Sequence, residues 1–351
     1  DTLGALFRQM NDPTPARGGR YKDVRYFNGG LFRNIEPIDL VEAEVRLLAD
    51  AAQEDWARVQ PPIFGSLFES SMGAAQRHAF GAHFTSEADI QKVVLPTIVR
   101  PWRERIQAAK SLSALADLRQ QLAAFHVLDP ACGSGNFLYV AYREIKRLEI
   151  DLLLRAYDLF GKQAEKRLGS SSLITTRQFF GIDKNPFAVE LAKVTLMLAK
   201  ELAIEETQAA LGTIQQELGY EFDRALPLDN LDENIRCQDA LLEDCPPADA
   251  IVGNPPYQSK NKMQEEYGRA YLNKVRARFP DVPGRADYCV YWFRKAHDHL
   301  QAGGRAGLVG TNTIRQNYSR EGGLDYIVGN GGRNTQAAST PEWVGEAPVP
   351  D

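Results

Sequence analysis

Short apolar runs in this chain each end in an acidic or amide residue, and a turn follows each run. Apolar residues at helical spacing follow the first two runs, so strand and helix patterns alternate. Such alternation predicts an open, mostly parallel α/β sheet with helices on both faces. The carboxyl ends of parallel strands lie at one edge of the sheet, where ligands bind. The residues that end the runs at 125–131, 177–183, 234–239 and 249–254 are Asp129, Asp183, Asp239 and Asn254.

Helix signals fill the stretches between these runs. Asn185 and Pro186 supply an N-cap and a first-turn proline for a helix over 187–203. A helix over 287–301 is predicted to end at Gly303 and Gly304, before a fifth strand at 305–310. Because Asp183 lies far beyond the first strand, residues 150–176 are interpreted as an inserted helical extension and surface loop. An amphipathic helix is predicted from Leu40 to about residue 59.

A glycine loop, Cys132-Gly133-Ser134-Gly135-Asn136, follows the first strand. Glycine permits a ligand to approach the backbone closely. A P-loop is excluded because Gly-Asn-Phe stands where Gly-Lys-Ser/Thr is needed, and a nicotinamide fingerprint is disfavoured by Leu138. The remaining ligand is the amino-acid end of S-adenosylmethionine, with Asp129 facing its ammonium group. A tight turn without a ligand is the alternative.

Two later acids fit the same ligand. Asp183 ends the second strand, where a carboxylate can accept both ribose hydroxyls of a nucleoside. Asp239 can accept from the amino group of adenine, but it serves equally well as an ordinary turn residue.

Asn254-Pro255-Pro256-Tyr257 follows the fourth strand. Two prolines fix the backbone, so the Asn254 side-chain oxygen and the Pro255 carbonyl can each accept one N–H of a planar amino group. The Tyr257 ring can stack on the attached heterocycle. Two such acceptors would aim the nitrogen lone pair at a methyl donor, whereas the missing cysteine after the prolines disfavours cytosine-C5 chemistry. In isolation the motif is also compatible with an ordinary strand-ending turn.

Together these motifs resemble adenine-N6 DNA methyltransferases with the gamma order of motifs. Residues 129–137 and 254–257 are similar to that family's first and fourth motifs, and residues 81–86 to the segment that covers the methionine moiety. Thr85 or Ser86 can also cap a helix that starts near Glu87, with Asp89 as the return partner. The resemblance implies a Rossmann-like class I fold and S-adenosylmethionine as cofactor, with S-adenosylhomocysteine as product. No metal is expected in this chain. The resemblance implies these cofactor-binding residues: Phe84, Thr85, Ser86, Asp129, Ala131, Gly133, Gly135, Phe137, Asp183 and Asp239. It implies these catalytic residues: Asn254, Pro255, Pro256 and Tyr257.

Residues 62–69, 312–316 and 325–328 narrow the resemblance to MmeI-like type IIL restriction–modification enzymes and their phage-defence relatives. The resemblance implies double-stranded DNA as the partner, with the target adenine flipped out of the duplex. The nuclease pattern of such enzymes is not found before Gly81, and too few residues follow the fifth strand for a target-recognition domain. We therefore expect a fragment of a larger enzyme that binds the cofactor but methylates DNA weakly or not at all alone. The expected parts are a helical spacer (1–80), a methyltransferase domain (81–345) and a truncated tail (346–351).

A net charge of −5 is unexpected for a DNA-binding protein. A basic arm over 258–286 is the local exception, with aromatic residues interleaved, and is predicted to be mobile. It can grip phosphates or hold an extruded base, or it can be a solvated helix that packs its aromatics on the sheet. Its basic residues are Lys260, Lys262, Arg269, Lys274, Arg276, Arg278 and Arg285.

The remaining composition indicates a cytoplasmic globular protein. Hydrophobic residues make up 44% and charged residues 25%, with no membrane-spanning run and no signal peptide. The four cysteines lack zinc-site spacing and are predicted to be reduced, buried thiols. Two other functions remain open: a protein-glutamine methyltransferase, which presents a similar planar amide, and a catalytically silent scaffold that binds S-adenosylmethionine.

Overall fold

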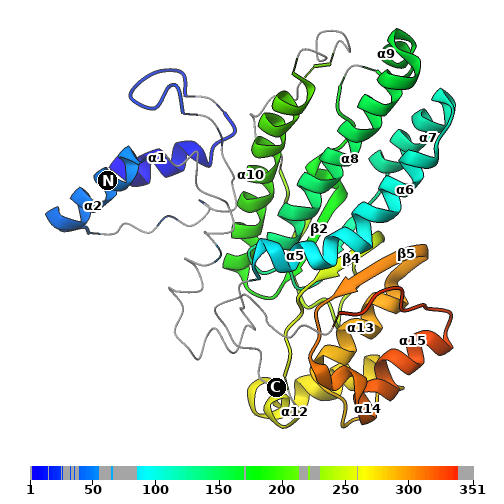
Figure 1. Ribbon diagram of the computed structural model, residues 1–351. Coiled ribbons are helices and arrows are strands. Elements are labelled where there is room, and N and C mark those ends of the chain that lie inside the picture. The colour runs from blue at the N-terminus through cyan, green and yellow to red at the C-terminus, as the bar shows by residue number, and fades with distance from the viewer. Residues whose placement is uncertain are drawn as a thin grey trace.

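The computed structural model describes residues 2–14, 16–24, 39–54, 85–169, 171–212, 230–258 and 260–338, with a few single positions between these ranges. Its helices and strands are shown in Figure 1. The helices are α1 (Thr2–Met10), α2 (Glu42–Gln53), α5 (Glu87–Val94), α6 (Arg100–Ala108), α7 (Leu112–Ala123), α8 (Asn136–Phe160), α9 (Lys162–Leu168), α10 (Pro186–Leu211), α12 (Lys260–Arg278), α13 (Tyr288–His299), α14 (Asn317–Arg320) and α15 (Tyr326–Gly329). The strands are β1 (Val127–Asp129), β2 (Phe179–Asp183), β3 (Ile235–Cys237), β4 (Ala248–Gly253) and β5 (Leu300–Leu308).

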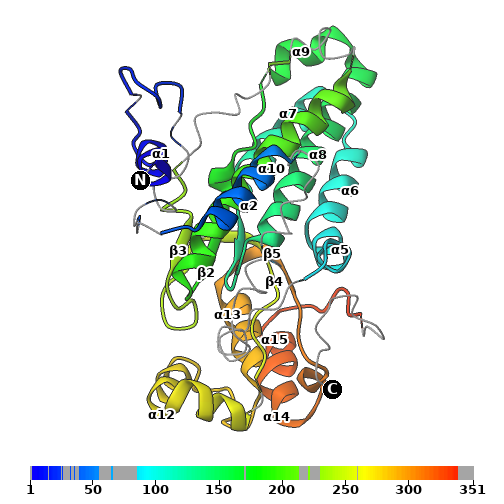
Figure 2. The same ribbon diagram turned by 90° about the vertical axis from the view of Figure 1, so that its left-hand side faces the viewer.

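The strands form one sheet in the order β3-β2-β1-β4-β5, and neighbouring strands are parallel throughout. Leu128 of the central strand β1 is in register with Phe180 of β2 and Ile251 of β4. Helices cover both faces (Figures 1 and 2). The predicted Rossmann-like parallel sheet is therefore confirmed, and its strand ends that carry acids or amides share one edge.

Alternation along the strands builds two cores. Val127, Phe179 and Val252 point into an upper core, which α5 to α10 cover. Leu128 and Ile251 point into a lower core, which lies between the sheet and the helices α12 and α13. This is the period-2 pattern of strands buried on both faces.

The insertion predicted at residues 150–176 is largely helical. α8 continues to Phe160 and buries Leu152 and Leu153, and α9 follows it. α10 lies beside α8 along most of its length and ends at Leu211, beyond the predicted end near residue 203.

The predicted ending of the helix over 287–301 is wrong. α13 ends at His299, and Gly303 and Gly304 lie inside β5. Ala248 is opposite Leu300 while Ala250 is opposite Arg305, so β5 bulges where the glycines stand. Gly303 has φ of +83°, which a glycine adopts without strain.

The basic arm is largely the helix α12, broken at Gly268, where φ is +75°. Leu272, Val275 and Phe279 of α12 are buried in the lower core, while Arg269 is exposed. The burial of Phe279 therefore favours the alternative in which the arm packs its aromatic residues on the sheet over the one in which it holds an extruded base.

The N-terminal helices α1 and α2 lie to one side of the main fold (Figure 1). The helix predicted from Leu40 is observed as α2. Residues 55–59 of that prediction lie outside the described residues. Within the described ranges, no helix has the length and apolar character needed to cross a membrane.

Candidate cofactor and amino-group site

The glycine loop joins β1 to α8 and reaches across to β2. The Cys132 backbone N–H donates to the Ile182 carbonyl at 2.9 Å. Gly135 adopts φ of +85° at the N-terminus of α8, and a Cβ there would lie 3.0 Å from Cα of Ala192. Positive φ and close packing against α10 therefore both require glycine at this position.

Asp129 is a buried acceptor with one oxygen unused. Its side chain is 1% exposed, and Oδ1 accepts the Ala131 backbone N–H at 3.1 Å. Oδ2 has no partner among the described residues. Burial raises the pKa of Asp129 to about 8, helped by the nearby charge of Asp183. A buried carboxylate oxygen without a donor fits an ammonium group, as the sequence predicts for the methionine end of the cofactor.

Asp183 holds the glycine loop against the end of β2. Its Oδ2 accepts the Gly133 backbone N–H at 3.0 Å, and Oδ1 accepts that of Asn185 at 2.8 Å. Burial raises the pKa of Asp183, while these backbone donors act in the opposite direction. Asn185 in turn caps α10, as predicted. The role of Asp183 toward a ribose remains a prediction.

Lys184 lies beside the predicted cofactor residue Asp239, and the sequence analysis did not single it out. Its Nζ lies 3.2 Å from Oδ2 of Asp239, at the ends of β2 and β3. The same ammonium lies over the ring of Tyr271, 4.2 Å from the centroid, and 5.6 Å from that of Tyr267. The arm helix α12 therefore reaches the strand ends where the nucleoside part of the cofactor is predicted. A lysine directly after the second-strand acid was the available signal.

In the Asn-Pro-Pro-Tyr turn, both the nitrogen and the oxygen of the Asn254 side-chain amide make hydrogen bonds. Nδ2 donates to Thr85 Oγ1 at 3.1 Å, and Oδ1 accepts the Tyr257 hydroxyl at 2.8 Å. Pro255 is buried, and the half-buried Tyr257 ring packs against the lower core.

The two halves of the site touch where β1 and β4 end. A Cβ built on Gly253 would lie 2.6 Å from Oδ1 of Asp129. Since Asn254 follows Gly253 directly, the turn that carries the amino-group acceptors begins in contact with the predicted ammonium acceptor.

We expect Gly253→Ala to displace the Asp129 carboxylate, because the added methyl group has no room. Overpacking of this kind costs about 1–3 kcal/mol of stability, and binding of S-adenosylhomocysteine is expected to weaken more than tenfold. Thermal unfolding and calorimetric titration measure both. Gly284→Ala is the matched control, since a Cβ on Gly284 meets nothing within 4 Å. Unchanged affinity in Gly253→Ala would contradict the tight contact.

Other predicted cofactor residues are placed less directly. Ser86 caps α5, its Oγ accepting the Asp89 backbone N–H at 3.2 Å and donating to the Asp89 carboxylate at 2.7 Å, so that part of the prediction is confirmed. Phe137 is 4% exposed and packs in the upper core. Phe84 lies outside the described residues.

Asn136 was not predicted as a site residue. It is buried in the glycine loop, and its Oδ1 has no partner within the described part of the chain.

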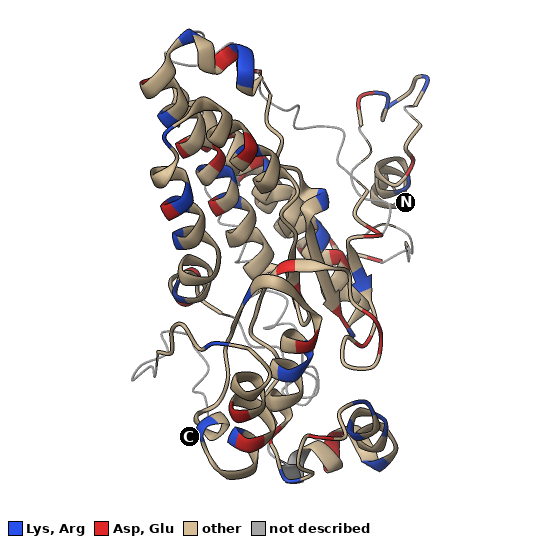
Figure 3. Ribbon diagram, turned by 90° about the vertical axis from the view of Figure 1, so that its right-hand side faces the viewer, with Lys and Arg blue, Asp and Glu red and all other residues tan. Residues whose placement is uncertain are grey.

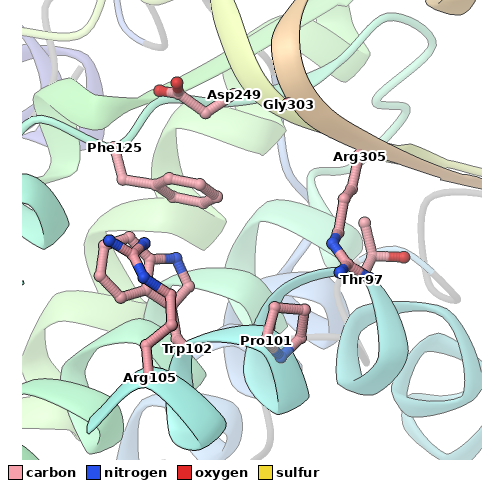
Figure 4. A pocket seen from close by; sticks show the side chains of 8 residues that line it. All are labelled: Thr97, Pro101, Trp102, Arg105, Phe125, Asp249, Gly303 and Arg305. Carbon is pink, nitrogen blue, oxygen red and sulfur yellow. The ribbon is translucent and has the colours of Figure 1, made fainter. Parts of the chain in front are cut away.

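A pocket of about 210 Å³ lies at the opposite edge of the sheet (Figure 4). Asp249 is the second residue of β4 and Phe125 precedes β1, so the pocket is at the amino ends of these strands. It is therefore not the predicted cofactor site. Its lining residues are Thr97, Pro101, Trp102, Arg105, Phe125, Asp249, Gly303 and Arg305.

Among the residues described, no group of three or more His, Cys, Asp or Glu side chains is arranged to hold a metal ion. The four cysteines are free thiols. The prediction that they are all buried is wrong for Cys237, which is exposed, and for Cys245, which is half-buried; Cys132 and Cys289 are buried.

The parallel sheet, the glycine loop and the adjoining Asn-Pro-Pro-Tyr turn define the class of S-adenosylmethionine-dependent methyltransferases with a Rossmann-like fold. The family model described as MmeI, DNA-methyltransferase domain, matches residues 104–349. The chain therefore belongs to the MmeI DNA-methyltransferase family.

Individual relatives agree. The chain is 30% identical to "DNA methyltransferase A" of Bacillus subtilis (strain 168) over 334 residues, which cover 90% of this chain and 35% of that protein. It is 26% identical to "Adenine-specific methyltransferase PglX" of Streptomyces coelicolor, over 94% of this chain and 24% of that protein. The solved structure of the type IIL restriction-modification enzyme MmeI in complex with DNA matches with a TM-score of 0.75 and 28% identity, covering 94% of this chain and 44% of MmeI. The chain thus spans less than half the length of each of these relatives.

Proposed function

We propose that this DNA methyltransferase module transfers a methyl group to the exocyclic N6 of adenine. The proposal is supported by the close approach of Gly253, which directly precedes Asn254, to the Asp129 carboxylate at the end of β1. The proposed acceptors for an amino group would therefore lie beside the proposed acceptor for the methyl donor's ammonium group. The adenine-specific name of the relative PglX supports the same base.

On the acceptor side, Asn254 Oδ1 and the Pro255 carbonyl take the two N–H groups of the target base. Oδ1 already accepts from Tyr257, but an amide oxygen has two lone pairs and can take a second donor. With both N–H groups held, the nitrogen lone pair is aimed in one direction. Alignment of this kind is worth up to about 7–11 kcal/mol in well-oriented systems.

The target atom cannot be reached inside a duplex. The base must therefore be flipped out, at a cost of a few kcal/mol. The Tyr257 ring, next to Asn254, is available to stack on the extruded base and so offset part of that cost.

On the donor side, Asp129, Asp183 and the glycine loop would hold S-adenosylmethionine, with Asp129 Oδ2 accepting from its ammonium group and Asp183 from its ribose hydroxyls. When bound, it would supply an electrophilic sulfonium methyl group. Transfer of that group to the amino nitrogen would release the thioether S-adenosylhomocysteine and one proton.

The test is the identity of the product. Double-stranded DNA is incubated with methyl-tritiated S-adenosylmethionine and the protein as expressed from its gene, and the labelled nucleosides are separated. We expect label in N6-methyl-2′-deoxyadenosine. Label in N4-methyl-2′-deoxycytidine would contradict the choice of base, and label in protein but not DNA would favour glutamine methylation.

The exposed face of α12 is proposed to contact DNA phosphates. Lys and Arg are mixed with Asp and Glu over most of the fold (Figure 3), and the net charge is −5. DNA phosphates would therefore be bound by a small group of basic side chains and not by a broad basic surface. Arg278 pairs with Asp244 at 3.0 Å, whereas Arg269 and Lys274 are exposed beside the lower core. These two side chains are therefore the best placed for phosphates.

We expect Arg269→Ala and Lys274→Ala each to lower the slope of log binding constant against log salt concentration by about 1. DNA affinity is measured by fluorescence anisotropy at several salt concentrations. Lys166→Ala is the matched control, because Lys166 is exposed on α9, far from α12 (Figures 1 and 2). Equal slopes in all variants would remove α12 from the DNA interface.

We further propose that this module acts within a restriction–modification or phage-defence enzyme. The support is the MmeI structure and a putative type II restriction enzyme and methyltransferase of Methanocaldococcus jannaschii, 24% identical over 63% of this chain and 21% of that protein. Target recognition, and a nuclease where present, would be supplied by other parts of such an enzyme.

A further inference from the structure

We propose that Thr85 is a positioning residue for methyl transfer, which holds the Asn254 amide in its working orientation by accepting from Nδ2 at 3.1 Å. This inference rests on the proposed function of Asn254 as an amino-group acceptor. It assigns Thr85 a role separate from the cofactor contact that its motif implies.

The need for such a residue follows from the shape of the amide. Asparagine carries an oxygen acceptor and an NH₂ donor of similar size, and only the oxygen can accept from a target amine. Rotation by half a turn about the last side-chain bond would present Nδ2 to the target instead. The site therefore works only if something selects one orientation.

Thr85 and Tyr257 select it together. The phenol of Tyr257 donates more readily than it accepts, since an oxygen lone pair is delocalised into the ring, so it faces Oδ1 at 2.8 Å. Nδ2 is then left needing an acceptor, and Thr85 is that acceptor. The Thr85 side chain is 4% exposed, so water does not replace it easily.

Thr85 can act as a fixed point because α5 is anchored immediately after it. Ser86 caps the helix, and Glu87 lies 3.5 Å from the Arg143 guanidinium of α8. Gln91 Nε2 donates to Glu144 at 3.0 Å, also on α8. Asn254 is thereby held in place by the helices α5 and α8 as well as by its own strand β4.

The experiment compares Thr85→Val, which keeps the shape but removes the acceptor, with Thr85→Ser, which keeps the acceptor. Both are made in the protein as expressed from its gene. Thr195→Val is the matched control, since Thr195 is fully buried on α10 and its hydroxyl has no partner in the described structure. The readouts are kcat and KM for DNA methylation, the Kd of S-adenosylhomocysteine, and the crystal structure of Thr85→Val.

We expect Thr85→Val to lower kcat about 10–100-fold, as misplacement by a fraction of an ångström to 1 Å does, with the Kd of S-adenosylhomocysteine and the KM for DNA near those of the parent. Thr85→Ser is expected to recover most of the lost kcat, and the Asn254 amide is expected to rotate in the crystal structure of Thr85→Val. If Thr85→Val fails to fold, Thr85→Ala provides the same comparison.

Unchanged kcat in Thr85→Val would overturn the proposal. A loss confined to cofactor affinity would make Thr85 a cofactor-binding residue instead. Failure of the proposed function is distinguishable, because the parent protein would then form no N6-methyl-2′-deoxyadenosine at all, whatever residue stands at position 85.

Discussion

Asp129→Asn is expected to stabilise the ligand-free protein at pH 8.5 while weakening its affinity for S-adenosylhomocysteine about 100-fold. Asp129 is buried with Oδ2 unpartnered, and its pKa is raised from 3.8 to about 8. The folded state therefore holds a proton that the unfolded chain has lost, so stability falls as pH rises from about 4 to about 8. At about 1.4 kcal/mol for each pKa unit, ionising Asp129 without a ligand costs about 6 kcal/mol.

Cofactor binding has the opposite pH dependence. An ammonium group favours the ionised carboxylate, so binding below pH 8 must first release the Asp129 proton. Affinity of the parent protein should fall about 20-fold between pH 8.5 and 6.5, whereas Asp129→Asn should show little change. Urea unfolding at pH 5 and 8.5, with calorimetric titration at pH 6.5 and 8.5, measures both effects. Equal pH dependence in parent and variant would contradict the role of Asp129.

Asn254→Ala is expected to lower the rate of methyl transfer about 10²–10³-fold, the usual loss when one preorganised hydrogen-bonding group of a reaction site is removed. The affinity for S-adenosylhomocysteine should stay within about threefold of the parent value, because Asn254 is proposed to bind the target amino group and not the cofactor. Single-turnover transfer of tritiated methyl groups to DNA measures the rate, and calorimetry measures the affinity.

The control for this variant is Asn330→Ala, an exposed asparagine just after α15. It should match the parent in both measurements. A rate for Asn254→Ala within threefold of the parent would show that the chemistry lies elsewhere, and would favour a scaffold that binds the cofactor without transferring methyl groups.

Local sequence rules predicted much of this molecule. The strand that ends at Asp129, the loop that needs Gly135, and the caps at Ser86 and Asn185 all depend on residues close in sequence. Alternation of strand and helix then predicted the parallel sheet. The shared edge of its strands follows from that topology.

Contacts between distant segments could not be predicted in the same way. The Thr85–Asn254 bond depends on how α5 meets the end of β4, and the Lys184–Asp239 ion pair on how β2 meets β3. No local spacing specifies either. Gly303 followed by Gly304 is a typical helix end, but Gly303 lies in a bulge of β5. Here strand pairing with β4 determines the structure, not the local preference of glycine. Contacts between segments distant in sequence determine the structure at these positions.

A crystal structure with S-adenosylhomocysteine bound is the most direct test. We predict that the ligand's ammonium group lies on Asp129 and its ribose on Asp183, with the sulfur turned toward Asn254. A ligand bound at the opposite edge of the sheet, or with its sulfur directed away from the Asn-Pro-Pro-Tyr turn, would contradict it.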